Sequence, residues 1–198
     1  LHGRDPLILG RQLCEGGSDL IQLRAKSWPP ARILKVAEGL RRLTRETGTR
    51  LVINDHPRIA IEADADFCHL GQEDFFDGGY SRVSELIPKG HALRIGLSTH
   101  APSQAERAVV AGAAYVAIGP VHATPTKPGV PPVTLDYVRW AAANLALPWF
   151  AIGGIHLDNL DSVLAAGARR VCVVSAILHA PDVAGACQRF RERLVSAP

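Results

Sequence analysis

The sequence contains no methionine, and its 198 residues include only four cysteines. Cys14, Cys68, Cys172 and Cys187 lie far apart, mostly within apolar runs, and none of them forms a CxxC pair. This spacing argues against a metal finger. We therefore predict that all four are reduced residues of the protein core.

Long apolar runs are also missing from the chain. No stretch approaches the roughly 18 consecutive apolar residues of a membrane span, and no basic segment followed by an apolar one opens the sequence. Neither a membrane anchor nor a signal peptide is predicted, so we expect a cytoplasmic protein. Because the chain begins at Leu1 and lacks methionine, we also expect that a further segment precedes it.

The excess of positive charge is small. The formal net charge is +3, and the basic residues are scattered, so the sequence lacks the footprint of a nucleic-acid-binding protein. Hydrophobic residues make up 47% of the chain, which suffices for one large core and predicts a single domain over residues 1–198. The sequence leaves the oligomeric state open, and a homo-oligomer is compatible with it.

Short apolar runs rich in β-branched residues recur along the chain, and each is typical of a strand buried on both faces. These runs are Asp19–Lys26, Arg50–Asp55, Asp66–Gly71, Arg94–His100, Tyr115–Val121, Trp149–Ile155 and Arg170–Leu178. Segments with helical spacing alternate with them, the clearest being Pro30–Thr47, Ala101–Ala111, Leu135–Leu145 and Leu157–Ala166. Such alternation predicts parallel strands joined by right-handed crossovers.

The number of strands favours a closed barrel over an open sheet. The segment Leu7–Glu15 reads as a helix with no strand ahead of it, so we expect an eighth strand before Leu1. Eight βα units form a (β/α)8 TIM barrel of the α/β class. The active site of such a barrel lies at the carboxyl ends of its strands.

Three polar residues alternate with apolar ones in the first run. Period two sends Gln22, Arg24 and Lys26 to the same face, which would be the barrel mouth. An arginine fork beside a lysine suits an anionic ligand. The alternative is a strand end that is simply exposed to solvent.

Carboxylates follow the next two strands. Asp55 comes directly after Val52–Asn54, and Asp74 ends the segment His69–Asp74. Mg²⁺ binds one or two carboxylates and completes its octahedron with phosphate oxygens and water, so Asp55 and Asp74 are the candidate ligands. The alternative role is helix capping, which is common for aspartate.

Later loops add hydroxyls, a lysine and glycines. Gly119–Gly129 closes a strand with a proline-stiffened loop whose Thr124, Thr126 and Lys127 can hydrogen-bond a phosphate or a heterocycle. The segments around Gly154 and around Val174 and Ser175 follow the last two strands, where many barrels hold a phosphate on backbone N–H groups. Glycines needed only for tight turns are the alternative there.

Ser98 ends another strand, directly before Thr99 and His100. A serine hydrolase is not indicated, because no G-x-S-x-G elbow surrounds the serine. We expect Ser98 to hydrogen-bond the ligand instead. No histidine has the spacing of a zinc site.

Seven motifs occur in order along nearly the whole chain: Gln-Leu-Arg-x-Lys, Ile-Asn-Asp, His-Leu-Gly-Gln-Glu-Asp, Gly-Leu-Ser-Thr-His, Gly-Pro-Val-x-x-Thr-Pro-Thr-Lys, Ala-Ile-Gly-Gly-Ile and Val-Val-Ser-Ala-Ile. This series resembles the thiamine-phosphate synthase family. The resemblance implies a transferase that condenses 4-amino-2-methyl-5-hydroxymethylpyrimidine diphosphate with a thiazole phosphate, releasing diphosphate.

The resemblance also implies roles for individual residues. The pyrimidine diphosphate would contact Gln22, Arg24, Lys26, Asn54, Ser98 and Lys127, of which Arg24, Lys26, Ser98 and Lys127 would be catalytic. Mg²⁺ would be held by Asp55 and Asp74. The thiazole side would contact Thr124 and Thr126, and its phosphate Gly154, Val174 and Ser175.

Two departures from the family pattern keep alternatives open. Ala25 stands where the family usually has glutamate, and His122 and Ala123 replace the usual aromatic residue and proline. A related thiazole tautomerase uses a histidine in this segment, although not at the position matched by His122. A non-catalytic barrel that binds thiamine-pathway phosphates is the other alternative.

Overall fold

Seven parallel strands form one sheet in the order β1 to β7. The computed structural model describes residues 4–124 and 131–196. The strands are β1 Leu20–Leu23, β2 Arg50–Asn54, β3 Phe67–Gly71, β4 Arg94–Thr99, β5 Tyr115–Ile118, β6 Trp149–Ile152 and β7 Val171–Cys172. The helices are α1 Pro6–Glu15, α2 Pro30–Thr47, α3 Pro57–Glu62, α4 Gln72–Phe76, α5 Pro102–Val110, α6 Thr134–Asn144, α7 Leu157–Ala165, α8 Ser175–Leu178 and α9 Val183–Val195, with a 3-10 turn η1 at Val83–Leu86.

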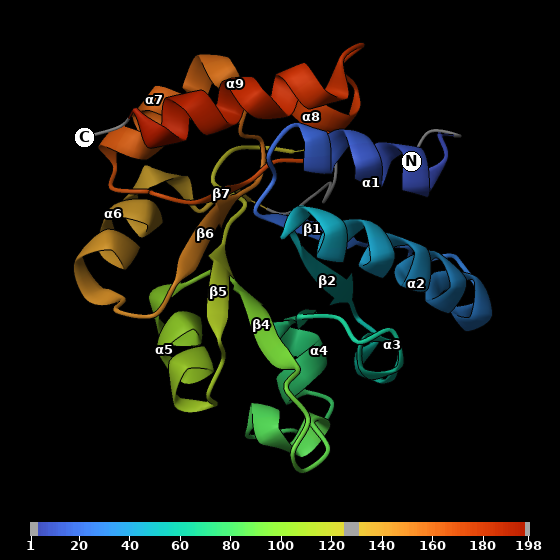
Figure 1. Cartoon of the computed structure of the whole chain (residues 1–198). Helices are drawn as coiled ribbons and strands as arrows, with labels where there is room; N and C mark the ends of the chain where they lie inside the picture. Colours follow the sequence, from blue (N-terminus) through green and yellow to red (C-terminus); the bar gives the residue numbers. More distant parts are fainter. Residues whose placement is uncertain (1–3, 125–130, 197–198) are drawn as a thin grey trace.

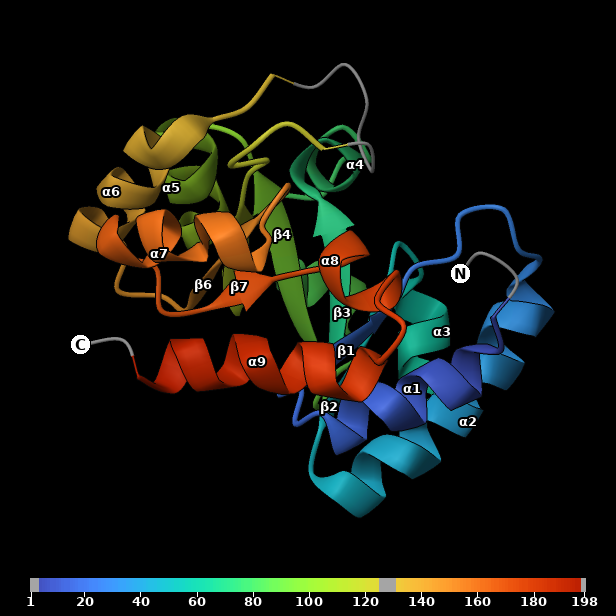
Figure 2. The ribbon, with the colours of Figure 1, turned by 90° about the horizontal axis from the view of Figure 1, so that it is seen from above.

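The sheet curls, and the helices lie around its outer side (Figures 1 and 2). Helix α1 packs against both α2 and α9. The predicted α/β barrel architecture is therefore confirmed as a curled sheet of parallel strands covered by helices. An eighth strand before Leu1 stays a prediction.

One predicted strand is partly a helix, and another, Asp19–Lys26, is a strand only over Leu20–Leu23. The run Arg170–Leu178 forms the two-residue strand β7, and its second half is the helix α8. Short apolar runs do not distinguish a strand from a buried helical turn, and this run contains both. Ile177 is buried on α8, so its apolar character reflects packing of a helix.

The sequence explains the bounds of α2. Pro30 occupies the first helical turn, where its missing N–H costs nothing, and Gly48 ends the helix with φ 74°. Ile33, Ala37 and Leu40 are buried along one face at the spacing of an amphipathic helix. This apolar face packs in the core between the sheet and its helices.

The inner face of the curled sheet carries a small apolar layer near the strand beginnings. Val52, Phe67 and Tyr115 form it, and Leu20 and Phe150 pack against it. The larger core lies between the sheet and its helices. Residues on the inner face beyond this layer, toward the carboxyl ends, are the ones that can reach a ligand.

All four cysteines are free, and three of them are buried. Burial raises the pKa of the Cys68 thiol to about 12, with a contribution from the negative charge of Asp55. Burial also raises the pKa of Cys172 to about 11. Free thiols agree with the prediction for all four residues, and a place in the core holds for Cys14, Cys68 and Cys187, whereas Cys172 is only partly buried.

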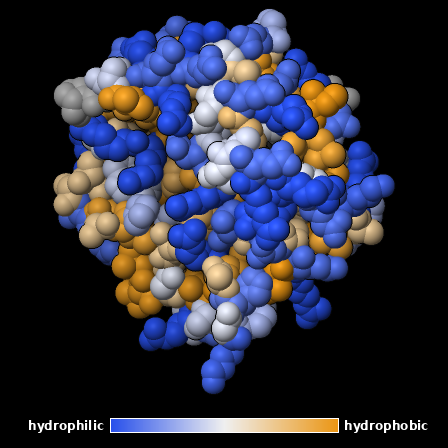
Figure 3. All heavy atoms as spheres, in the orientation of Figure 1, coloured by the Kyte–Doolittle hydropathy of each residue, from blue (hydrophilic) through white to orange (hydrophobic). Residues whose placement is uncertain are grey.

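The face shown in Figure 3 is mainly hydrophilic, and its apolar residues form small separate groups. No described helix combines the length and the apolarity that crossing a bilayer requires.

Candidate active site

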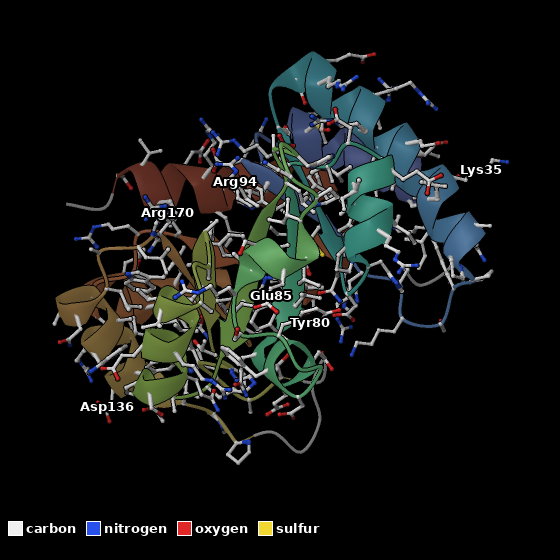
Figure 4. All side chains as sticks on the ribbon, turned by 90° about the horizontal axis from the view of Figure 1, so that it is seen from below. Lys35, Tyr80, Glu85, Arg94, Asp136 and Arg170 are labelled. Atoms are coloured by element: carbon white, nitrogen blue, oxygen red, sulfur yellow. The ribbon has the colours of Figure 1, made fainter. Side chains whose placement is uncertain are left out.

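The parallel strands bring their carboxyl ends to one edge of the sheet. Arg94 and Arg170 mark the opposite edge, where β4 and β7 begin, and they lie on the same side of the molecule in Figure 4. Asp136, in the first turn of the helix after β5, lies away from them. The predicted site residues therefore belong to the edge far from Arg94.

Strand β1 ends at Leu23, so of the three polar residues predicted to share one strand face only Gln22 lies on the strand. Gln22 is exposed between the buried Ile21 and Leu23, and Arg24 and Lys26 follow directly, both exposed. Lys26 Nζ lies 3.8 Å from Asp55 Oδ2. Within residues 4–124 and 131–196, Arg24 has no carboxylate at ion-pair distance, so its guanidinium is available to an anion.

Asp55 follows β2 in an unusual backbone conformation. Its φ is 65°, a left-handed value that aspartate tolerates better than most residues. Its N–H donates to the His69 carbonyl at 2.9 Å, which fixes the turn beside the end of β3. The next helix starts from His56 without a side-chain cap, so Asp55 does not serve as a helix cap.

Asp74 lies in the first turn of α4, directly after β3. Gly71 is the N-cap residue of α4, so Asp74 is not the N-cap, but its place in the first turn also suits the helix N-terminus. A Cβ added to Gly71 would lie 2.6 Å from Asp74 Oδ2. The missing side chain of Gly71 therefore lets the carboxylate fold back over the end of β3.

The two carboxylates come from segments that follow neighbouring strands. β2 and β3 are neighbours, with Asn54 paired to His69, so Asp55 and Asp74 follow adjacent strand ends. No group of three or more potential ligands forms a metal centre among the described residues. Mg²⁺ can bind one or two carboxylates when phosphate oxygens complete its shell, and its binding by Asp55 and Asp74 stays a prediction.

Gly71→Ala is expected to weaken Mn²⁺ binding, with Mn²⁺ as a spectroscopic substitute for Mg²⁺, by about tenfold. The new methyl group would occupy the place where the Asp74 carboxylate now lies. Electron paramagnetic resonance of Mn²⁺ in the presence of diphosphate measures the affinity. Gly39→Ala is the control, because a Cβ there meets the flexible end of Leu7 on the distant helix α1. Equal affinity of the Gly71 and Gly39 variants would refute this role of Gly71.

Ser98 lies on β4 and pairs with Gly71 at the end of β3. Its Oγ is 2.7 Å from His69 Nε2. His100 is turned away, since its Nδ1 bonds the Gly119 carbonyl. A Ser98–His100 dyad is not formed, which agrees with rejecting a hydrolase.

His69 and Tyr115 belong to the site, although the sequence analysis gave them no role. His69 Nδ1 lies 3.0 Å from the Tyr115 hydroxyl, and both side chains are buried. Burial raises the pKa of the Tyr115 phenol well above its usual range. One feature of the sequence could have identified His69. It is a histidine inside an apolar strand, two residues before Gly71, and residues two apart in a strand share a face.

The loop after β5 is described only in part. Thr124 is half-buried at its beginning, whereas Thr126 and Lys127 lie outside the described residues. His122 donates its backbone N–H to the Gly153 carbonyl at 3.1 Å. Burial, and to a lesser extent the nearby His156, lower the pKa of the His122 imidazole, so the ring is neutral at pH 7.

Backbone conformation and close packing explain the two glycines of the turn after β6. Gly153 and Gly154 have φ values of 102° and 63°. A Cβ on Gly154 would lie 2.6 Å from the Ala123 carbonyl oxygen, so only glycine fits beside the preceding loop. Val174 and Ser175 stand at the start of α8, with Val174 exposed. Phosphate binding by Gly154, Val174 and Ser175 stays a prediction.

Comparisons with known proteins show which family this chain resembles. The family model described as thiamine monophosphate synthase matches residues 2–177. A thiamine-phosphate synthase from Thermus thermophilus is 49% identical over 180 residues, covering 90% of this chain and 84% of the relative. One from Lawsonia intracellularis is 39% identical, covering 98% and 88%. The solved thiamine phosphate pyrophosphorylase from Pyrococcus furiosus superposes with a TM-score of 0.87 at 29% identity, covering 98% of this chain and 91% of that one.

Proposed function

The chain belongs to the thiamine monophosphate synthase family and is a transferase, and from this premise we propose its substrates, its metal and the roles of its residues. The substrates are 4-amino-2-methyl-5-hydroxymethylpyrimidine diphosphate and 4-methyl-5-hydroxyethylthiazole phosphate. The products are thiamine phosphate and diphosphate. The observation that carries the proposal is the gathering of Arg24, Lys26, Asp55 and Asp74 at adjacent strand ends.

The diphosphate group belongs at the ends of β1 to β4. Asp55 and Asp74 would hold Mg²⁺, which neutralises negative charge on phosphate oxygens when it is bound. Arg24 and Lys26 add positive charge from β1, and Lys127 adds it from the loop after β5. Lys26 lies beside Asp55. The ammonium group could therefore contact a phosphate oxygen while the carboxylate binds the Mg²⁺ on the same diphosphate. Gln22 and Asn54 would orient the pyrimidine, and Ser98 would hydrogen-bond the diphosphate.

The bond changes need no nucleophilic side chain. The C–O bond to diphosphate breaks first, and its electron pair leaves with the diphosphate. The pyrimidine stabilises the methyl cation that remains, and the lone pair of the thiazole nitrogen then forms the new C–N bond. The protein contributes charge neutralisation of the leaving group and alignment of the two substrates.

The thiazole phosphate belongs at the other half of the same edge. Thr124 and Thr126 would contact the thiazole, and backbone N–H groups near Gly154, Val174 and Ser175 would bind its phosphate. The support is their position after β5, β6 and β7, beside the ends of the strands that hold the diphosphate residues. Two anion-binding sites, one for the diphosphate and one for the thiazole phosphate, would then lie side by side at the strand ends.

A product assay tests the proposal. The chain is mixed with both substrates and Mg²⁺, and thiamine phosphate and diphosphate are measured. Formation of both products in equal amounts, abolished by EDTA, is expected. A thiazole tautomerase or a non-catalytic phosphate-binding barrel would form neither product. A cytoplasmic location stays part of the proposal, and cell fractionation with an antibody against the chain tests it.

A further inference from the structure

Three side chains on the inner face of the sheet form a hydrogen-bonded series that ends at Ser98. The Tyr115 hydroxyl lies 3.0 Å from His69 Nδ1, and His69 Nε2 lies 2.7 Å from Ser98 Oγ. Tyr115 is 6% exposed and His69 7%. The series therefore runs from buried residues toward the strand ends, where the diphosphate is expected.

Gly96 makes this series possible. β3, β4 and β5 are neighbours, and Gly96 pairs with His69 on one side and with Tyr115 on the other. A Cβ on Gly96 would lie 2.1 Å from Tyr115 Cζ, so the phenol ring occupies the space that a side chain would take. The ring crosses β4 in this way and stacks on His69, with centroids 5.6 Å apart.

The buried phenol sets the direction of the hydrogen bonds. Because burial raises its pKa, Tyr115 keeps its proton, and in the described part of the chain His69 is its hydrogen-bond partner. If Nδ1 carried the imidazole proton, the phenol hydrogen would be buried without an acceptor, at a cost of about 1–3 kcal/mol. The phenol therefore donates to Nδ1, and the imidazole proton that faces Ser98 is on Nε2.

The consequence appears at Ser98. His69 Nε2–H donates to Ser98 Oγ, so the serine oxygen is an acceptor toward the interior. Its own hydrogen is then free to point toward the ligand. We propose that Tyr115 and His69 are positioning residues that hold the Ser98 hydroxyl as a donor to the departing diphosphate. This inference rests on the proposed function.

Nuclear magnetic resonance tests the hydrogen-bond direction without any activity. The ¹⁵N shifts of His69 in the wild-type protein are expected to show protonated Nε2 and unprotonated Nδ1. Protonated Nδ1 would overturn the proposal, because Tyr115 would then be the acceptor. The ¹⁵N shifts show the direction of the hydrogen bonds whether or not the chain forms thiamine phosphate. Failure of this proposal can therefore be distinguished from failure of the proposed function.

Kinetics test the role of the series in turnover. Tyr115→Phe keeps the ring over Gly96 and removes only the O–H, and it is expected to lower kcat about tenfold with little change in the KM of the thiazole phosphate. In a Ser98→Ala background the same substitution is expected to have no further effect. An unchanged kcat, or an equal loss with and without Ser98, would overturn the proposal.

Tyr137→Phe is the matched control. This second buried tyrosine bonds Thr99 Oγ1 at 2.7 Å and the Ala101 carbonyl at 2.9 Å, on the helix side of β4. Loss of its hydroxyl removes buried hydrogen bonds but does not touch Ser98. Wild-type kcat is expected for this variant. A tenfold loss here as well would attribute the Tyr115 effect to general destabilisation and overturn the proposal.

Discussion

Asp55→Asn is expected to lower kcat by roughly 100-fold or more and to raise the Mg²⁺ concentration that half-saturates activity. Asparagine tolerates a left-handed backbone as aspartate does, so the turn with φ 65° should survive the change. What is lost is the charge that pairs with Lys26 and that, in the proposed site, would bind the metal. Initial rates measured over a range of Mg²⁺ concentrations give both quantities.

Asp64→Asn is the control for this substitution. Asp64 also has a positive φ, of 51°, but its carboxylate pairs with Arg41 and Arg45 on the surface. The Asp64 carboxylate and Arg45 are exposed, whereas Arg41 is partly buried, and such surface pairs contribute little to stability. Wild-type kcat and wild-type Mg²⁺ dependence are expected. The metal assignment would be wrong if the Asp55 and Asp64 variants behaved alike.

Lys127→Ala is expected to lower kcat by about 100-fold while leaving the KM of the thiazole phosphate nearly unchanged. In the proposed reaction Lys127 neutralises charge on the departing diphosphate, and this charge grows as the C–O bond breaks. A contact that strengthens in the transition state affects turnover more than binding. Steady-state kinetics with each substrate varied in turn separate the two effects.

Lys35→Ala controls for the loss of one positive charge. Lys35 is exposed on α2 and points outward, away from the strand ends (Figure 4). Its removal is expected to leave kcat and both KM values unchanged. If Lys127→Ala raised the thiazole KM and spared kcat, Lys127 would belong to the thiazole pocket instead.

Periodicity in the sequence predicted most of the fold. The bounds of α2 agree with the prediction at both ends because Pro30 and Gly48 punctuate a long amphipathic segment. The run Arg170–Leu178 was misassigned because two residues of strand and one turn of helix share the same apolar composition. Register and curling come from pairing between distant segments, which periodicity does not record.

The site was predictable where a residue's type alone implies chemistry. Charged residues at strand ends, such as Arg24 and Asp55, could be identified because a barrel places such ends together. The role of Gly71 could not, since it depends on how Asp74 folds back in three dimensions. The roles of Gly96 and Tyr115 could not be predicted either, because their contact with His69 depends on the register of three strands.

A crystal structure with diphosphate and Mn²⁺, located by its anomalous scattering, tests the central claim most directly. The account predicts one metal bound by the carboxylates of Asp55 and Asp74, with Arg24, Lys26 and Lys127 on the same diphosphate. A metal bound elsewhere, or a diphosphate that contacts none of these cations, would contradict it.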